Sequence, residues 1–311
     1  MLNNKKFLKL FSLLAIIVFM LSSCTNSKLN DSSLSKNPQY PLTFEDSFGC
    51  VTDIDSVPQK VVSLSPNITE IVCELGLIDN LVGRTDYCDY PEEVSNIDSI
   101  GGIIDPNIEK IVSLEPDIIF TDGMQSQETI SFLRQSGLKV VMLRGSEDFE
   151  GTYKIISDLG MIMNQADKAN TIIKNMKWKI EKIQQKVNSI KDKKSVFYLV
   201  SLDEDGVYTA GNETYINEIL KIAGVENVAQ DVDGWYYSIE KLCENNPQVI
   251  ICSDQNNTKQ SILDFEPISS LDAVKNQSIV EVDEDLISRQ GPRNIEGIKQ
   301  IVEKVYNINM G

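Results

Sequence analysis

The sequence predicts an α/β protein of two lobes, each with a central, parallel-rich β-sheet, joined by one long backbone helix. Short apolar runs alternate with helical patterns from Lys60 onward, which is typical of parallel sheets covered by helices. A long amphipathic stretch after Asn164 interrupts this alternation, which then resumes. Two similar short segments also occur, one in each half of the chain, so we expect the two lobes to share a local structure.

The first lobe is predicted to contain a parallel sheet. Apolar runs predict strands at residues 61–65, 117–121 and 139–143. Helical patterns follow two of these runs, at residues 67–75 and 125–136. Strands that alternate with helices in this way form βαβ units, in which helices cover the sheet.

A single amphipathic helix is predicted over residues 165–191, because apolar residues recur there at spacings of three and four. At about 1.5 Å per residue it would be roughly 40 Å long, the width of a small domain. We expect it to join the two lobes. Its predicted buried face is formed by Ala169, Ile172, Met176, Ile180, Ile183, Val187 and Ile190.

Behind this helix the alternation of strands and helices starts again, which predicts the second lobe. We expect strands at residues 195–200, 249–252 and 279–282, and helices at 215–223, from Ser238, and at 294–306.

The N-terminus has the pattern of a secretory signal. Lys5, Lys6 and Lys9 precede an apolar run over residues 11–21, which is too short to span a membrane, and Cys24 follows small residues. Residues 24–42 are rich in polar residues and are predicted to form a flexible tether.

These patterns divide the chain into five parts. They are a signal peptide at 1–23, the tether at 24–42, an N-terminal lobe at 43–163, the interlobe helix at 164–193 and a C-terminal lobe at 194–311.

Composition excludes several classes of function. The formal net charge is −17 and no basic groove is visible, so nucleic acid is not an expected partner. Histidine is absent, which argues against an imidazole-type metal site and against Ser-His or Cys-His catalysis. Of the six cysteines, Cys73, Cys243 and Cys252 lie in apolar stretches and are expected to be buried free thiols.

The repeated segment reads NIEKIVSLEPDIIF at residues 107–120 and SIEKLCENNPQVII at residues 238–251. Asn107 and Ser238 are good helix N-caps, so Glu109 and Glu240 would each be the second residue of a short helix. A carboxylate is favourable there, and helix capping alone is one explanation of both glutamates. Their occurrence at matching places raises the question of what two equivalent lobes share.

Five ordered blocks resemble the helical-backbone class of substrate-binding proteins of ABC importers, which serve cobalamin, ferric siderophores and haem. The blocks are VVSLSPNITEIVCELGLIDNLVGRTDYCDYPEE, PNIEKIVSLEPDII, YTAGNETYINEILKIAGVENVAQ, WYYSIEKLCENNPQVII and SRQGPRNIEGIKQIVEKVY. The resemblance extends from about Lys60 to the C-terminus. Within the class, DYCDYPEE is most similar to the cobalamin-binding branch.

The resemblance implies where this protein works and with what. It implies a monomeric protein, not an enzyme, on the extracytoplasmic face of the cell membrane. Leu21-Ser22-Ser23-Cys24 resembles a bacterial lipoprotein signal, in which a lipid on Cys24 would anchor the protein, and an ordinary cleaved signal is the alternative. The resemblance to the class also implies that Glu109 and Glu240 bind arginines of the ABC transporter permease subunits. Cobalamin or a related corrinoid would be captured between the lobes, with a ferric siderophore or haem as the alternative ligand.

The same resemblance suggests the ligand contacts. Tyr87 stands where cobalamin binders place a stacking tyrosine, and Asp285 with Arg289 matches a polar pair near the end of the C-terminal lobe. Tyr208, Trp235 and Tyr236 would face the ligand from the second lobe if the order of elements holds, and Asp122 replaces an apolar or aromatic residue after its strand. The candidate contacts are therefore Tyr87, Asp122, Tyr208, Trp235, Tyr236, Asp285 and Arg289.

Two other functional classes stay open. Ser238 and Lys241 match the Ser-x-x-Lys pattern of serine acyltransferases, although no Lys-Thr-Gly follows and the repeat explains the same residues. A structural surface lipoprotein without a ligand is the other alternative.

Overall fold

The structure of this protein is a computed structural model that describes residues 37–202 and 206–311. The predicted signal peptide, Cys24 and most of the predicted tether lie outside the described residues. Residues 35–311 belong to one unit. No helix in the described ranges is both long enough and apolar enough to span a membrane.

The N-terminal lobe is built on a four-stranded sheet in the order β4-β3-β5-β6, in which every pairing is parallel. Its strands are β3 (Val61–Ser63), β4 (Leu81–Arg84), β5 (Ile118–Thr121) and β6 (Val140–Met142). Every residue of β3, β5 and β6 is buried, as expected for strands covered on both faces. The three strands predicted in this lobe are confirmed, whereas β4 was not predicted.

The C-terminal lobe contains a sheet in the order β10-β8-β7-β11-β12, with β9 paired to β7. The pairings of β7 with β9 and β11, and of β11 with β12, are parallel, which confirms the predicted parallel character. The antiparallel strands β8 and β10 extend the sheet at one edge and were not predicted. The strands are β7 (Ser195–Leu202), β8 (Val207–Thr209), β9 (Glu226–Asn227), β10 (Tyr236–Tyr237), β11 (Val249–Ser253) and β12 (Ile279–Val282).

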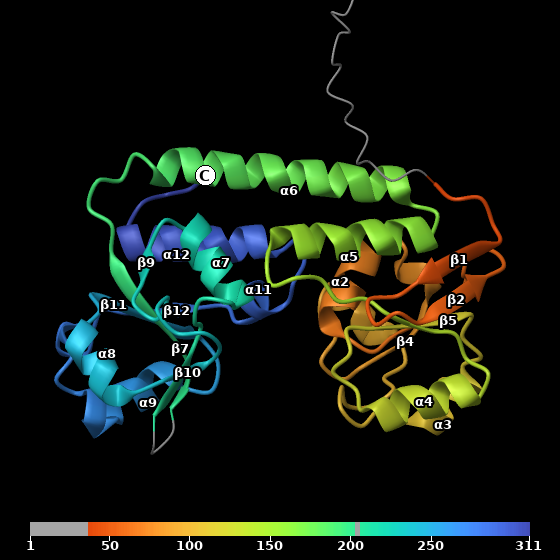
Figure 1. The fold of residues 1–311 in the computed structure, drawn as a ribbon, viewed down its shortest axis with the longest axis horizontal. Coiled ribbons are helices and arrows are strands. Elements are labelled where there is room, and N and C mark those ends of the chain that lie inside the picture. The colour runs from red at the N-terminus through yellow and green to blue at the C-terminus, as the bar shows by residue number, and fades with distance from the viewer. Residues whose placement is uncertain (1–36, 203–205) are drawn as a thin grey trace, which may run out of the picture. The chain divides into compact units, whose positions relative to one another are not determined.

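Helices flank both sheets (Figure 1). The N-terminal lobe has α2 (Pro66–Glu74), α3 (Ile108–Ser113) and α4 (Gln127–Gln135). The C-terminal lobe has α7 (Tyr215–Ile222), α8 (Ile239–Asn245), α9 (Thr258–Asp264), α10 (Asp272–Lys275), α11 (Asp285–Ser288) and α12 (Asn294–Tyr306). Side-chain caps define several starts; for example, Asn107 accepts a hydrogen bond from the Lys110 amide and Ser238 accepts one from the Lys241 amide.

The long predicted helix is α6 (Ala166–Val187), and it lies alongside α5 (Phe149–Ile162), a helix that was not predicted (Figure 1). All the apolar residues predicted to form its inner face are buried except Ile190, which is partly buried beyond its end. The two helices approach so closely that a Cβ at Gly160 of α5 would collide with Ala169 of α6.

One apolar cluster joins the two lobes through these helices. It includes Leu159 of α5, Met176 of α6, Ile219 of α7 and Ile298 of α12. Because α6 contacts helices of both lobes, it forms the backbone that the sequence predicted.

The N-terminal end of the described chain is attached to the first lobe. The antiparallel hairpin of β1 (Leu42–Glu45) and β2 (Val51–Ile54) was not predicted. Its turn contains buried Asp46, whose Oδ2 accepts a hydrogen bond from the Met142 amide and lies 3.1 Å from Nη2 of Arg134. Before the hairpin, the hydroxyl of Tyr40 donates to the Ile162 carbonyl at 2.6 Å.

The five cysteines in the described ranges are Cys50, Cys73, Cys88, Cys243 and Cys252, and all are free. This confirms the predicted free thiols at Cys73, Cys243 and Cys252, but of these three only Cys252 is buried. The prediction of full burial was wrong for Cys73 and Cys243, which are half-buried in the second halves of α2 and α8.

Candidate functional site

A pocket of about 590 Å³ lies between the two lobes. Loops that follow the carboxyl ends of β3, β4, β5 and β6 contribute to it from one lobe, and the loop after β12 contributes from the other. This is the edge at which parallel α/β sheets bind ligands. The lining includes Tyr87, Asp122, Trp235, Asp285 and Arg289, five of the residues that the sequence suggested as ligand contacts.

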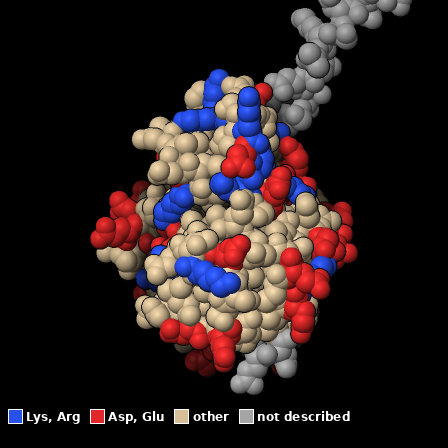
Figure 2. Space-filling model, turned by 90° about the vertical axis from the view of Figure 1, so that its left-hand side faces the viewer, with Lys and Arg blue, Asp and Glu red and all other residues tan. Residues whose placement is uncertain are grey.

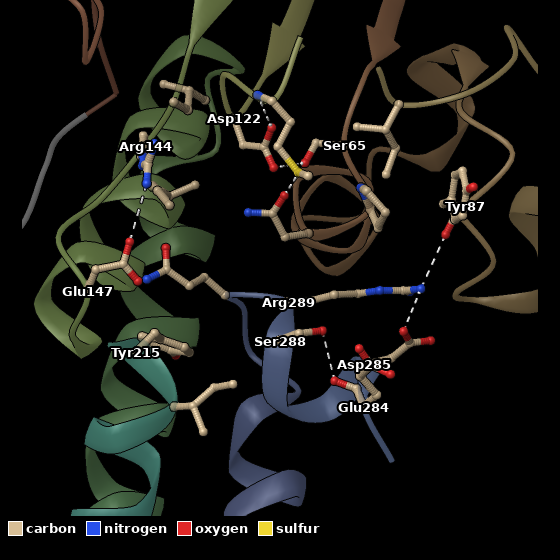
Figure 3. Close-up of a pocket in the computed structure, with 18 of the residues that line it drawn as sticks. Ser65, Tyr87, Asp122, Arg144, Glu147, Tyr215, Glu284, Asp285, Ser288 and Arg289 are labelled. Carbon is tan, nitrogen blue, oxygen red and sulfur yellow. Dashed lines mark hydrogen bonds and ion pairs between the residues drawn. The ribbon is translucent and has the colours of Figure 1, made fainter. Parts of the chain in front are cut away.

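Each lobe presents a carboxylate that is held by a serine. In the N-terminal lobe, Oγ of Ser65 donates to Oδ2 of Asp122 at 2.6 Å. In the C-terminal lobe, Oγ of Ser253 donates to Oε2 of Glu284 at 2.8 Å. In both cases the serine is at or just after the end of one strand, and the acid follows the neighbouring strand. Figure 3 shows Asp122 with Ser65 on one side of the pocket and Glu284 on the other.

An ionic cluster centred on Arg289 joins the lobes at the pocket, and Figure 3 shows the part of it formed by Arg289 with Asp285 and Tyr87. Nη1 of Arg289 lies 2.9 Å from Oε1 of Glu70 and 2.7 Å from Oδ1 of Asp89, both of the N-terminal lobe. Nη2 lies 2.8 Å from Oδ1 of Asp285. Nη1 of Arg293 is also 2.8 Å from Oε1 of Glu70. The two arginines therefore connect the C-terminal lobe to the first lobe.

Burial affects the charge of this cluster. The Glu70 side chain is 3% exposed, and its Oε2 has no hydrogen-bond partner among the described residues. Burial raises the pKa of Glu70 despite the opposing effect of the two arginines. Burial likewise raises the pKa of Asp285, although Arg289 opposes the shift. Three carboxylates, of Glu70, Asp89 and Asp285, face the two guanidinium groups of Arg289 and Arg293, so the cluster has more acids than bases.

A second group of interlobe contacts lies on the other side of the pocket. The hydroxyl of buried Tyr215, at the start of α7, donates to Oδ1 of Asn294 at 2.9 Å and accepts from Oγ1 of Thr152 in α5 at 3.1 Å. The amide group of Gln290 donates to the Ser146 carbonyl at 3.1 Å. The pocket is therefore bounded on two sides by polar contacts between the lobes.

Two aromatic side chains line the pocket with large exposed surfaces. Tyr87 of the N-terminal lobe is 60% exposed and Trp235 of the C-terminal lobe is 45% exposed. In contrast, Tyr208 and Tyr236 lie outside the pocket lining, where they pair across β8 and β10 with an edge-to-face ring contact at 6.1 Å. Their strands form the far edge of the sheet, which the sequence did not predict.

The predicted docking residues have equivalent local structures. Glu109 is the second residue of α3 and Glu240 is the second residue of α8, and both side chains are exposed. Neither glutamate makes an ion pair with another residue in the described part of the chain. Figure 1 shows α3 and α8 on the side of their lobes that is opposite α6.

The Ser-x-x-Lys pattern does not form a catalytic pair in this structure. Oγ of Ser238 accepts the hydrogen bond from the Lys241 amide, as a helix cap does. Nζ of Lys241 lies instead 2.7 Å from Oδ2 of Asp231 and 5.1 Å from the centre of the Tyr237 ring. Within the described ranges, no cluster of three or more acidic or cysteine side chains is arranged to hold a metal ion.

Sequence reasoning predicted Asp285 beside Arg289 but missed the partners of Arg289 in the N-terminal lobe, Glu70 and Asp89. Glu70 stands among isoleucines in α2, and an acid on the apolar side of a helix is the signal that could have identified it. Glu284 was also missed, although it directly precedes the predicted contact Asp285 and lines the pocket.

Comparisons with known proteins agree with this arrangement. A family model for periplasmic binding proteins matches residues 61–286. The sequence is 33% identical over 310 residues to YvrC, an uncharacterised ABC transporter substrate-binding lipoprotein of Bacillus subtilis, covering 97% of this chain and 98% of the relative. It is 25% identical over 280 residues to a cobalamin-binding protein of Halobacterium salinarum, covering 86% of this chain and 75% of the relative.

A solved structure supports the same fold. The crystal structure of a possible iron-binding, periplasmic solute-binding protein from Staphylococcus epidermidis matches with a TM-score of 0.73 and 28% sequence identity. The match covers 81% of this chain and all of the other chain (100%).

Proposed function

Because this chain belongs to the periplasmic binding protein family, we propose that it is the ligand-binding lipoprotein of an ABC importer and that its ligand is cobalamin or a related corrinoid. The observation that carries the proposal is the interlobe pocket, which exposed aromatic rings enter from both lobes. The protein would capture the corrinoid outside the cytoplasm and deliver it to the permease, without changing it chemically.

The chemistry of the lining suits a corrin. A corrin is a broad, largely apolar disc with polar edges, so its site needs aromatic faces and a few polar groups that fix orientation. Tyr87 and Trp235 supply such faces from opposite lobes, while Asp122, Asp285 and Arg289 supply polar groups. The volume of about 590 Å³ is within the range of small-molecule sites.

Haem and ferric siderophores are the alternative ligands. The similarity to a possible iron-binding protein at 28% identity supports this alternative. The similarity to a cobalamin-binding protein covers more of this chain, at 86%, and supports the corrinoid.

We further propose that Glu109 and Glu240 dock the protein onto two arginine sites of the permease subunits. Both carboxylates are exposed on short helices whose caps fix their positions, and no described residue neutralises them. A carboxylate on each lobe would give a two-point contact with a two-fold transporter.

The position of the protein in the cell follows from the same proposal. A lipid on Cys24 would hold the monomer at the extracytoplasmic face of the cell membrane. The similarity to a relative that is named as a lipoprotein supports the anchor.

The test is direct identification of the ligand. The purified protein is incubated separately with cyanocobalamin, haemin and a ferric siderophore, desalted, and examined by absorbance spectroscopy, and calorimetry then measures each affinity. Retention of the corrinoid spectrum at one equivalent supports the proposal. Retention of haemin or of the ferric siderophore instead would show that the ligand is not a corrinoid. Retention of none of the three would contradict the proposed function.

A further inference from the structure

The pocket has more carboxylates than guanidinium groups. Its lining contains the acids Asp122, Glu147, Glu284 and Asp285 but only the bases Arg144 and Arg289. We propose that this surplus makes the site selective for corrinoids whose edges are carboxamides and against tetrapyrroles or corrinoids whose edges are carboxylates. The inference rests on the proposed corrinoid function and adds to it the charge class of the ligand.

Arg289 cannot readily serve as an anion receptor, because its donors are engaged by the protein. Nη1 bonds to Glu70 and Asp89, and Nη2 bonds to Asp285 and lies 3.3 Å from the Tyr87 carbonyl. To bind a ligand carboxylate, the guanidinium would have to give up one of these contacts or share it with the ligand, and the contact to Glu70 is buried. The protein thus already surrounds this cation with more negative charge than it can balance.

Arg144, the other arginine of the pocket lining, offers little attraction for a ligand carboxylate. Its Nη2 lies 3.6 Å from Oε1 of Glu147, which also lines the pocket, and the two side chains are 59% and 44% exposed. A ligand carboxylate near Arg144 would therefore also meet Glu147. Water weakens the attraction of such exposed charges, so this arginine contributes little net attraction for an anion.

Asp122 and Glu284 are placed to recognise amide N–H groups. Their serine partners hold one oxygen of each carboxylate, at 2.6 Å and 2.8 Å. The other oxygen of Asp122, Oδ1, accepts a hydrogen bond from the Met124 amide at 3.1 Å, so a ligand N–H would use the remaining lone pairs of this carboxylate. The other oxygen of Glu284, Oε1, has no hydrogen-bond partner among the described residues. A carboxamide edge can donate to such an oxygen, whereas a carboxylate edge would be repelled by it. The two acids come from opposite lobes, so the preference applies on both sides of the ligand.

The outer surface does not show the same surplus everywhere. Figure 2 shows the end of the molecule at the C-terminal lobe, where acidic and basic side chains both occur and the basic ones gather mainly toward the top. The whole chain is also acidic, with a formal net charge of −17, so the variants below are chosen to separate the effect of the pocket from general repulsion.

The test compares ligands that differ by one charge. The protein is titrated at pH 7 and low salt with cyanocobalamin and, separately, with each of its monocarboxylic acids. In these acids one peripheral propionamide is hydrolysed to a propionate. We expect the acids to bind at least tenfold more weakly, a difference of about 1.4 kcal/mol. In the double variant Asp122→Asn, Glu284→Gln, this penalty should fall to less than threefold, because both changes keep the shape and remove the charge.

The control variant is Glu266→Gln, which removes an exposed acid outside the pocket lining and should leave the penalty unchanged. Equal affinity of the parent protein for cyanocobalamin and all its acids would overturn this inference while leaving the corrinoid function intact. A penalty that persists in the double variant would also overturn the assignment to these two acids. If the parent protein does not bind cyanocobalamin, the proposed function fails and this inference fails with it.

Discussion

Nη1 of Arg289 in the C-terminal lobe lies 2.9 Å from Oε1 of Glu70 in the N-terminal lobe, and the two side chains are 12% and 3% exposed. This pair links segments that are 219 positions apart in the sequence. Because the link lies beside the ligand pocket, the geometry of the pocket depends on it.

The first prediction is that the two sides of this cluster respond unequally to mutation. Arg289→Gln leaves buried Glu70 with Arg293 alone and half-buried Asp285 without its cation, and is expected to lower the free energy of unfolding by up to about 3 kcal/mol, the low end of the cost of breaking a buried ion pair. Glu70→Gln removes a carboxylate from a cluster that has a surplus of them, so stability at pH 7 should equal or slightly exceed that of the parent. Urea denaturation measures both values. Equal losses in the two variants would contradict the unequal charge balance.

The second prediction concerns pH. Burial raises the pKa of Glu70 above its usual value of 4.5, so above that pH the folded state binds more protons than the unfolded chain. Stability from this group is therefore complete below about pH 4.5 and is lost as the pH rises through the folded-state pKa. Asp285 acts in the same direction. Unfolding measured from pH 4 to pH 8 should show a flatter profile for Glu70→Gln than for the parent, and identical profiles would count against the shift.

The third prediction tests the aromatic face. Tyr87→Ala should weaken corrinoid binding by about 1 to 3 kcal/mol, roughly ten- to a hundredfold, because stacking area is lost. Tyr87→Phe keeps the ring and should bind nearly as the parent does. Phe132→Ala removes an exposed aromatic of α4 outside the pocket and serves as the control. An unchanged titration for Tyr87→Ala would assign this tyrosine to the structure of its loop.

Much of the fold could be predicted because its signals are local. The buried positions of α6 recur at helical spacing, and β5 and β11 are apolar runs of a length typical of strands. The resemblance to substrate-binding proteins of ABC importers is confirmed by the family match and by a relative that aligns along nearly the whole chain. Helix α5 escaped prediction because most of its surface is buried, which removes the contrast between an apolar and a polar face.

The site could be predicted only in part, because its contacts depend on how distant segments meet. Asp285 and Arg289 are one helical turn apart, so their pairing could be read locally. The bond from Arg289 to Glu70 could not, since no local pattern relates residues in different lobes. Tyr208 and Tyr236 were expected at the ligand, but their position depends on β8 and β10, which are too short to give a clear alternating pattern.

The fourth prediction is that Cys24 carries the membrane anchor. Its position after the apolar run 11–21 and the small residues Ser22 and Ser23 suggests lipidation. Cys24→Ser should move the protein from the membrane fraction to the soluble fraction after expression, as measured by fractionation and immunoblotting. Cys50→Ser is the matched control and should leave the protein at the membrane. A Cys24→Ser protein that stays fully membrane-bound would contradict the anchor.

The last prediction separates docking from helix capping at Glu109 and Glu240. If these glutamates only favour helix starts, reversal to lysine should cost less than about 1 kcal/mol of stability and leave uptake intact. If they bind permease arginines, Glu109→Lys and Glu240→Lys should keep the parent's melting temperature and ligand affinity but lose transporter-dependent uptake, because like charges then meet.

The chain offers a close control for this experiment in Glu128. Glu128 is likewise the exposed second residue of a helix, α4, that is capped by a serine, but it lies outside the repeated segment. Glu128→Lys should therefore match the other two variants in stability and differ from them in uptake, and the Glu109→Lys, Glu240→Lys double variant should show the largest loss of uptake. Full uptake by the double variant would refute docking. Equal losses of uptake in all three single variants would instead indicate a general effect of surface charge or helix stability. All three glutamates are exposed second residues of capped helices, and they differ in their places on the lobes.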